Sequence, residues 1–136
     1  MYAISCKVKG TPYILGINRD TNVLQLYGLS DYTFMNGGYW TLSNKGRLTE
    51  VYSGQYLCPN KCNATKGNVV KLCPWNSGDC TSNGWVFGDT GGEIYYAKLG
   101  ADNALKSTKL AISFDDNNTC TLRNDPTNQT SFKIIQ

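Results

Sequence analysis

Apolar and polar residues alternate in short runs along the whole chain. Runs such as YAISCKV, NVLQLYGL and GEIYYAKL are bounded by Gly, Asn, Asp, Ser or Pro. A period of two places successive side chains on opposite faces of a strand, and the bounding residues are typical of turns. Twelve such runs can be counted, and helical periodicity is almost absent. The sequence therefore predicts an all-β protein with twelve short strands.

The runs recur with a long internal period. Three aromatic triplets lie 45 and 47 residues apart, namely Trp40-Thr41-Leu42, Trp85-Val86-Phe87 and Phe132-Lys133-Ile134. A repeat of this length indicates one supersecondary unit used several times. We therefore predict one domain, residues 1–136, with three four-strand units at about 1–44, 45–90 and 91–136. Three units can close a barrel without an open edge, whereas a sandwich without symmetry is the alternative.

The aromatic residues of the three triplets are predicted to be core residues. Trp40, Trp85 and Phe132 recur with the unit and stand among alternating apolar residues. The third unit is the least regular, because the stretch from residue 100 to 109 lacks clear alternation. We expect this stretch to be an irregular loop.

Charge and hydropathy limit the partners. The formal charge is +3, charged residues make up 17%, and the Lys and Arg residues are scattered singly. Nucleic-acid binding usually needs a clustered basic face, so we expect none. No stretch approaches the roughly 18 apolar residues of a membrane helix, so we expect no membrane insertion. The N-terminus lacks the apolar core of a signal peptide. Either the chain is not secreted by that route, or a signal was removed and Met1 was added.

Six cysteines and no histidine define the candidate chemistry. Four of the cysteines, Cys58, Cys62, Cys73 and Cys80, fall within 23 residues, whereas Cys6 and Cys120 lie far from them. These spacings do not fit paired zinc ligands, so we expect no metal or cofactor. We predict one or two local disulfides, with the pairing left open, plus buried free thiols. Disulfides slightly favour an oxidising, secreted setting, and the compartment is otherwise undetermined.

The residues give no support for catalysis. Without His, a Ser-His-Asp or Cys-His site cannot form within this chain. Asp115 and Asp116 are adjacent acidic residues, and neighbours on a strand point to opposite faces. We interpret this pair as part of a solvated turn and predict that the protein is not an enzyme.

The repeats resemble the β-trefoil fold, and within it the ricin-B-like (R-type) lectins. The motif-like stretches of the second unit are Tyr56-Leu57-Cys58, Gly67–Leu72, Cys73-Pro74-Trp75 and Asn83-Gly84-Trp85. The family's Gln is Asn83 here, and Cys73 stands where a stacking aromatic is common. The resemblance implies a β-trefoil with three pseudo-threefold repeats. It also implies a lectin that binds glycans or glycoproteins, and it leaves a homodimer open.

Candidate sugar-binding residues occur in each unit. A shallow sugar site needs an aromatic ring and amide or carboxylate groups that hold hydroxyls. In the second unit, which we favour, these are Trp75 as the stacking ring with Asn60, Asn76, Asp79 and Asn83. In the first unit they are Tyr27 with Asn18, Asp20, Asp31 and Asn36. In the third unit they are Asp115, Asp116 and Asn128, with Arg123 in the aromatic position.

Two other functions remain as alternatives. A trefoil protease inhibitor would act through an exposed loop, with residues 60–67 and 100–108 as candidates. A receptor-targeting module of a larger toxin or enzyme is also compatible with sugar binding. The fold alone does not choose among these functions.

Overall fold

The computed structural model describes residues 2–21, 23–30, 38–74, 80, 83–88, 92–115, 119–125 and 130–135 of the chain. These residues form short strands and the 3-10 helix η2 (Asn60–Cys62). The strands are β1 (Ala3–Val8), β2 (Thr11–Asn18), β3 (Val23–Gly28), β4 (Trp40–Leu42), β5 (Leu48–Glu50), β6 (Tyr56–Pro59), β7 (Val70–Cys73), β8 (Asn83–Phe87), β9 (Ile94–Leu99), β10 (Leu105–Phe114), β11 (Cys120–Arg123) and β12 (Thr130–Ile135). The all-β prediction is confirmed.

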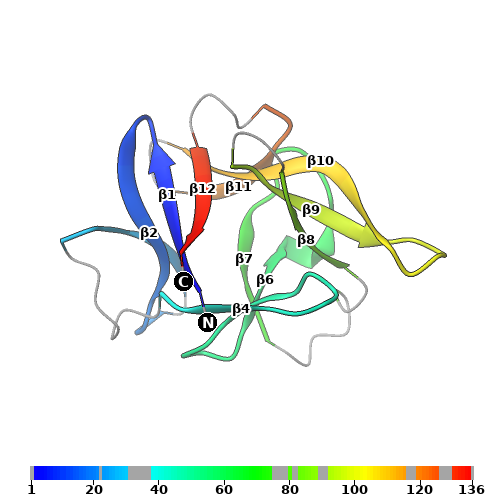
Figure 1. The fold of residues 1–136 in the computed structure, drawn as a ribbon, viewed down its shortest axis with the longest axis horizontal. Helices are drawn as coiled ribbons and strands as arrows, with labels where there is room; N and C mark the ends of the chain where they lie inside the picture. Colours follow the sequence, from blue (N-terminus) through cyan, green and yellow to red (C-terminus); the bar gives the residue numbers. More distant parts are fainter. Residues whose placement is uncertain are drawn as a thin grey trace.

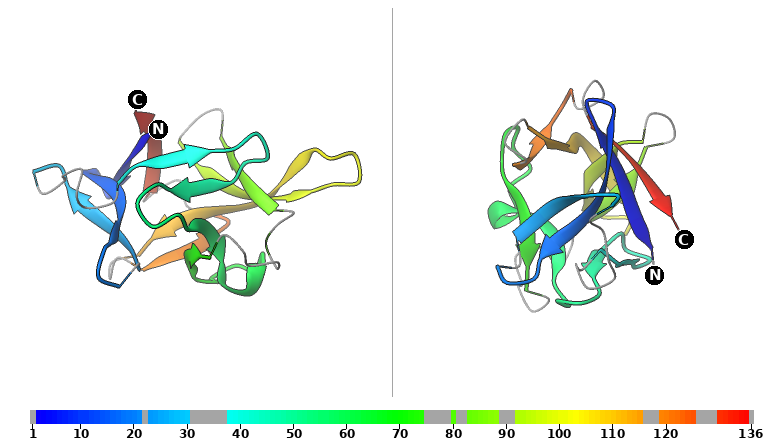
Figure 2. Two further views of the ribbon diagram at one scale, coloured as in Figure 1. Left: turned by 90° about the horizontal axis from the view of Figure 1, so that it is seen from below. Right: turned by 90° about the vertical axis from the view of Figure 1, so that its left-hand side faces the viewer.

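The strands form three four-stranded antiparallel sheets (Figure 1). Their orders are β12-β1-β2-β3, β4-β5-β6-β7 and β11-β10-β9-β8. The first sheet joins the two ends of the chain, because β12 pairs with β1 over their whole length. The hairpin of β9 and β10 projects from the rest of the molecule (Figures 1 and 2).

The predicted β-trefoil, with twelve strands in three units closing one barrel, is corrected by this arrangement. The strands are divided among three separate sheets, and no described ladder runs from one sheet into the next. Isolated bridges at Tyr2–Trp40 and Val69–Thr121 join the sheets instead. Alternation and turn residues specify strands and hairpins locally, whereas the joining of sheets depends on long-range pairing that a period cannot specify.

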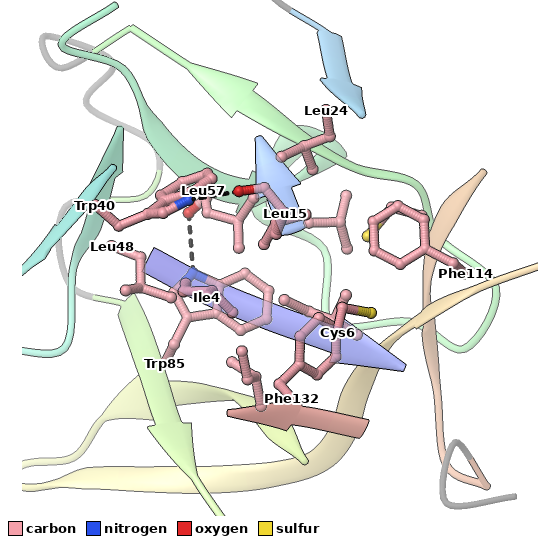
Figure 3. Close-up of a cluster of buried hydrophobic side chains, with 14 of the residues drawn as sticks. Ile4, Cys6, Leu15, Leu24, Trp40, Leu48, Leu57, Trp85, Phe114 and Phe132 are labelled. Atoms are coloured by element: carbon pink, nitrogen blue, oxygen red, sulfur yellow. Dashed lines mark hydrogen bonds between the residues drawn. The ribbon is translucent and has the colours of Figure 1, made fainter. Parts of the chain in front are cut away.

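The aromatic residues of the three triplets lie in the core, as predicted. The exposed fractions of Trp40, Trp85 and Phe132 are 0, 2 and 7%. Figure 3 shows them around Ile4 at the centre of a single cluster of apolar side chains. The indole Nε1 of Trp40 donates to the carbonyl of Leu15 at 3.1 Å (Figure 3). The core therefore satisfies the polar group of this large side chain.

The cysteines behave as predicted. Disulfides join Cys58 to Cys73 and Cys62 to Cys80, with Cα–Cα distances of 6.1 and 5.5 Å. Cys6 and Cys120 are buried free thiols. Burial raises the pKa of Cys6 to about 12 and raises the pKa of Cys120 well above its ordinary value. Both thiols therefore stay protonated at neutral pH.

Candidate functional site

A polar pocket opens on the hairpin of β10 and β11. Its cavity volume is about 210 Å³. The lining residues are Ser113, Phe114, Asp115, Thr121, Arg123 and Asp125. All of them except Phe114 carry a hydroxyl, carboxylate or guanidinium group, so a ligand here meets hydrogen-bonding groups.

Side chains alternate between the two faces along β10 and β11, and this places two hydroxyl groups on the face that lines the pocket. Ser113 and Thr121 are direct partners in the register of β10 and β11, whereas their neighbours Phe114 and Cys120 lie in the core. The exposed fractions of Ser113 and Thr121 are only 7 and 8%. The floor of the pocket is therefore a pair of nearly buried hydroxyl side chains within a regular antiparallel ladder.

Asp115 directly follows β10 and is held in place by two hydrogen bonds with Thr119. Its Oδ1 accepts a hydrogen bond from the backbone N–H of Thr119 at 2.9 Å. Its own N–H donates to the carbonyl of Thr119 at 3.1 Å. These two bonds fix the position of the carboxylate beside the hydroxyl pair. The prediction that Asp115 belongs to a turn agrees with this geometry, while Asp116 lies outside the described residues.

Arg123 and Asp125 supply charge at the rim of the pocket. Both are exposed, and Arg123 pairs in register with the buried Ala111. Among the described residues, neither Arg123 nor Asp125 forms an ion pair. Their hydrogen-bonding groups can therefore interact with a ligand.

The predicted residues of the first unit serve the β2–β3 turn. Asn18 Oδ1 accepts hydrogen bonds from the N–H groups of Asp20 and Thr21, at 2.9 and 3.2 Å. Tyr27 donates its hydroxyl to the carbonyl of Ile17 at 2.8 Å. Burial, and then the Asp20 carboxylate, raise the pKa of Tyr27. The described members of this set thus have structural partners, while Asp31 and Asn36 lie outside the described residues.

Only two predicted residues of the second unit are described. Asn60 begins η2, and its N–H donates to the carbonyl of Val69 at 2.8 Å. Asn83 Nδ2 donates to the Tyr96 hydroxyl at 2.5 Å. Trp75, Asn76 and Asp79 lie outside the described residues, as does Asn128 of the third unit.

Three predicted residues lie in three different hairpins: Asn18 is the last residue of β2, and Asn60 and Asp115 directly follow β6 and β10. The backbone or side chain of each forms hydrogen bonds that help to close its hairpin. They are therefore not brought together into one site. Asp115 and Asn83 line different pockets.

Sequence reasoning did not select Ser113, Thr121, Arg123 and Asp125 as site residues. One signal was available. In LAISFD and TCTLR, the polar Ser113 and Thr121 interrupt apolar residues at alternate positions. Hydroxyl residues at paired positions of adjacent strands indicate a polar face on an otherwise buried hairpin.

Neither a metal site nor a membrane helix is found in the part of the chain that the structure describes. There, His, Cys, Asp and Glu form no group of three that could hold a metal ion. No helix there has the length and apolar character needed to cross a membrane.

Comparisons with known proteins show a similarity of fold and give no information on function. No family model and no curated protein matches the chain. Six chains of known structure match it. One is the mdaA-1 domain, known from a solution structure, with a TM-score of 0.66 and 16% identity. The match covers 98% of this chain and 88% of that chain. At such low identity, the similarity carries no function from one protein to the other.

Proposed function

We propose that the protein binds carbohydrate without catalysis, through the pocket of the β10–β11 hairpin. The observation that carries the proposal is the lining of this pocket. Paired hydroxyls form its floor, and two carboxylates and one guanidinium stand around them. Sugar hydroxyls donate and accept hydrogen bonds, and this set of groups offers partners for both roles.

The charge of the pocket favours a neutral sugar. Asp115 and Asp125 bring two negative charges, and Arg123 brings one positive charge. A phosphate or sulfate would meet repulsion from the carboxylates, whereas a neutral hydroxyl can donate to them in charge-assisted hydrogen bonds. The described lining residues present no exposed aromatic ring, because Phe114 is only 1% exposed. Hydrogen bonds of about 0.5–1.5 kcal/mol net each must then supply most of the affinity, so binding should be weak.

The alternative of a protease inhibitor is less well supported. A protease commonly binds a partner segment in extended form. Asn60–Cys62 forms η2, and Cys62 is tied to Cys80 by a disulfide. Residues 105–107 belong to β10 and are already paired with β9. A receptor-targeting role for a larger protein is compatible with sugar binding and adds no separate site.

A titration of neutral monosaccharides and oligosaccharides, followed by amide NMR shifts, tests the proposal. We expect shifts at residues 113–115 and 121–125 with wild-type protein. Arg123→Ala should weaken binding by about tenfold, as expected for loss of a charge-assisted hydrogen bond. Lys133→Ala is the control, because Lys133 is an exposed cation on β12 that lies outside this pocket.

Two results would count against the site. Equal binding by wild type and Arg123→Ala would move the site elsewhere in the chain. Binding of no neutral glycan on an array, by folded protein at high loading, would contradict the function itself. A panel of proteases would then test the inhibitor alternative.

A further inference from the structure

A second pocket, at the turn between β4 and β5, has the opposite charge. Its cavity volume is about 450 Å³. The lining residues are Ser43, Asn44, Lys45, Arg47 and Asn83. We propose that this pocket binds a sulfate group carried by an acidic polysaccharide. This site is separate from the neutral-sugar pocket in both position and chemistry, so it does not rest on the proposed function.

The two cations of the pocket are available to an anion. Among the described residues, neither Lys45 nor Arg47 forms an ion pair. The Arg47 guanidinium instead lies 4.3 Å from the ring centroid of Tyr56. Contact with an aromatic face leaves the edge of the guanidinium free to donate hydrogen bonds. The Lys45 ammonium, Arg47 and the two amides can together donate to the oxygens of one sulfate.

The turn that carries these groups is held in place before any ligand binds. The N–H of Ser43 donates to the carbonyl of Arg47, and the N–H of Arg47 donates to Ser43 Oγ, both at 3.0 Å. The Gly46 carbonyl accepts from the N–H of Trp85 at 2.7 Å. A fixed turn loses little conformational entropy on binding, and this favours a specific anion site.

Two further cations continue from the pocket along the projecting hairpin. Asn83 pairs in register with Lys98, and Lys98 pairs with Lys106. Cross-strand partners point to the same side of a sheet, and neighbouring strands lie about 4.8 Å apart. Both lysines are exposed, and neither forms an ion pair in the described part of the chain. Directly opposed like charges destabilise a sheet, so an anion bound between them would relieve this repulsion.

This row of cations suits a chain with several anionic groups. A single sulfate fits the pocket, and a second anionic group of the same chain can reach the lysine pair. Single-stranded nucleic acid is the competing polyanion, and its binding sites usually stack bases on aromatic rings. None of the described residues that line this pocket is aromatic, whereas Ser43, Asn44 and Asn83 suit the hydroxyls of a sugar chain. The chemistry therefore favours a sulfated polysaccharide.

Binding to dextran sulfate, with neutral dextran beside it, tests the proposal. At low salt, wild-type protein should bind dextran sulfate, and binding should weaken as salt rises. Lys45→Gln and the double variant Lys98→Gln/Lys106→Gln should each lose about tenfold in affinity, as expected for loss of charge-assisted contacts. The matched control is Lys7→Gln/Lys66→Gln, which removes two exposed positive charges outside the pocket. It should retain affinity within about twofold, because it changes only net charge.

Several outcomes would overturn the inference. An equal loss in the control variant would mean general charge attraction without a site. Tighter binding of a single-stranded DNA oligonucleotide than of dextran sulfate would assign the surface to nucleic acid. Amide shifts at residues 43–47 with inorganic sulfate, but no binding of dextran sulfate, would leave only a free-anion site. Arg123→Ala should still bind dextran sulfate, so failure of the neutral-sugar site is distinguishable from failure of this one.

Discussion

The backbone N–H of Trp85 donates a 2.7 Å hydrogen bond to the carbonyl oxygen of Gly46. This bond joins the β4–β5 turn of one sheet to β8 of another. The same contact recurs between Phe132 and Gly92 at 2.6 Å, and between Trp40 and Tyr2 at 2.8 Å. Each aromatic residue of the predicted triplets thus fills the core with its ring and joins two sheets with its backbone.

Gly46→Ala should be strongly destabilising. Gly46 has φ +76°, and an added Cβ would lie 2.8 Å from the carbonyl oxygen of Trp85 and 2.6 Å from Leu105 Cδ1. Left-handed strain of about 1–2 kcal/mol and overpacking of about 1–3 kcal/mol should add to roughly 3 kcal/mol. Urea unfolding followed by tryptophan fluorescence measures the loss.

Gly10→Ala is the matched control, because it introduces the left-handed backbone strain without the overpacking. Gly10 has φ +81°, and an added Cβ would meet no atom within 4 Å. It should therefore lose only about 1–2 kcal/mol. If the two variants lose the same stability, the close approach of Gly46 to Trp85 does not hold the sheets together.

Trp85→Phe tests the hydrogen bond that the buried indole of Trp85 donates. Trp85 Nε1 donates to the carbonyl of Leu57 at 3.0 Å, and both groups are buried. Phe keeps most of the apolar volume but leaves this carbonyl without the indole donor. We expect a loss of about 1–3 kcal/mol, against about 3–5 kcal/mol for Trp85→Ala. Denaturant unfolding measures both, and an unchanged Trp85→Phe protein would show that the hydrogen bond adds nothing.

The sequence predicts those features that depend on local patterns. Alternation identifies the strands, and the aromatic period identifies Trp40, Trp85 and Phe132 as core residues. The pattern predicts an irregular stretch from residue 100 to 109, and in the structure residues 100–104 lie between β9 and β10, which begins at Leu105. The register shifts between Ser107 and Ala111, where Lys109 has φ 64°. This irregularity moves the side chains out of strict alternation, so the pattern along the sequence was hidden.

The contacts that join the sheets, and the residues that line the pockets, were harder to predict from the sequence. Joining depends on single long-range bonds such as that between Trp85 and Gly46, which leave no periodic trace. Asn18 and Asp115 are predicted to bind a ligand because their side chains can hold hydroxyls. In the structure both side chains also accept hydrogen bonds from nearby backbone N–H groups, and Asp115 in addition lines the β10–β11 pocket. Residue type alone cannot separate these two uses.

The buried thiols should make stability fall at alkaline pH. Burial raises the pKa of Cys6 from 9.0 to about 12. Below pH 9 both folded and unfolded chains keep the proton, so stability is unaffected. Between pH 9 and about 12 the unfolded chain ionises while the folded chain stays protonated, so the free energy of unfolding decreases. The slope should approach about 1.4 kcal/mol per pH unit for one thiol.

The measurement is the free energy of unfolding in urea between pH 8 and 10.5. The control is Cys6→Ala, whose stability is lower at all pH values but whose decline should be less steep. In a parallel assay at pH 8, a thiol reagent should label neither Cys6 nor Cys120 in the native protein and both after unfolding. Rapid labelling of the native protein would contradict the burial of these thiols.

Trp75→Ala and Arg123→Ala together decide which unit binds a neutral sugar. The sequence predicts that the Trp75 ring stacks on the sugar, and this residue lies outside the described part of the structure. If the second unit holds the site, Trp75→Ala should lose binding of neutral glycans while the protein stays folded, and Arg123→Ala should bind normally. If the β10–β11 pocket holds it, the pattern reverses, with a loss of about tenfold in Arg123→Ala.

Arg123→Lys separates the effect of charge from that of side-chain shape, because a lysine keeps the positive charge but lacks the planar fork of the guanidinium. Recovery of binding in Arg123→Lys would mean that charge alone holds the sugar, whereas a loss equal to that of Arg123→Ala would assign recognition to the guanidinium geometry.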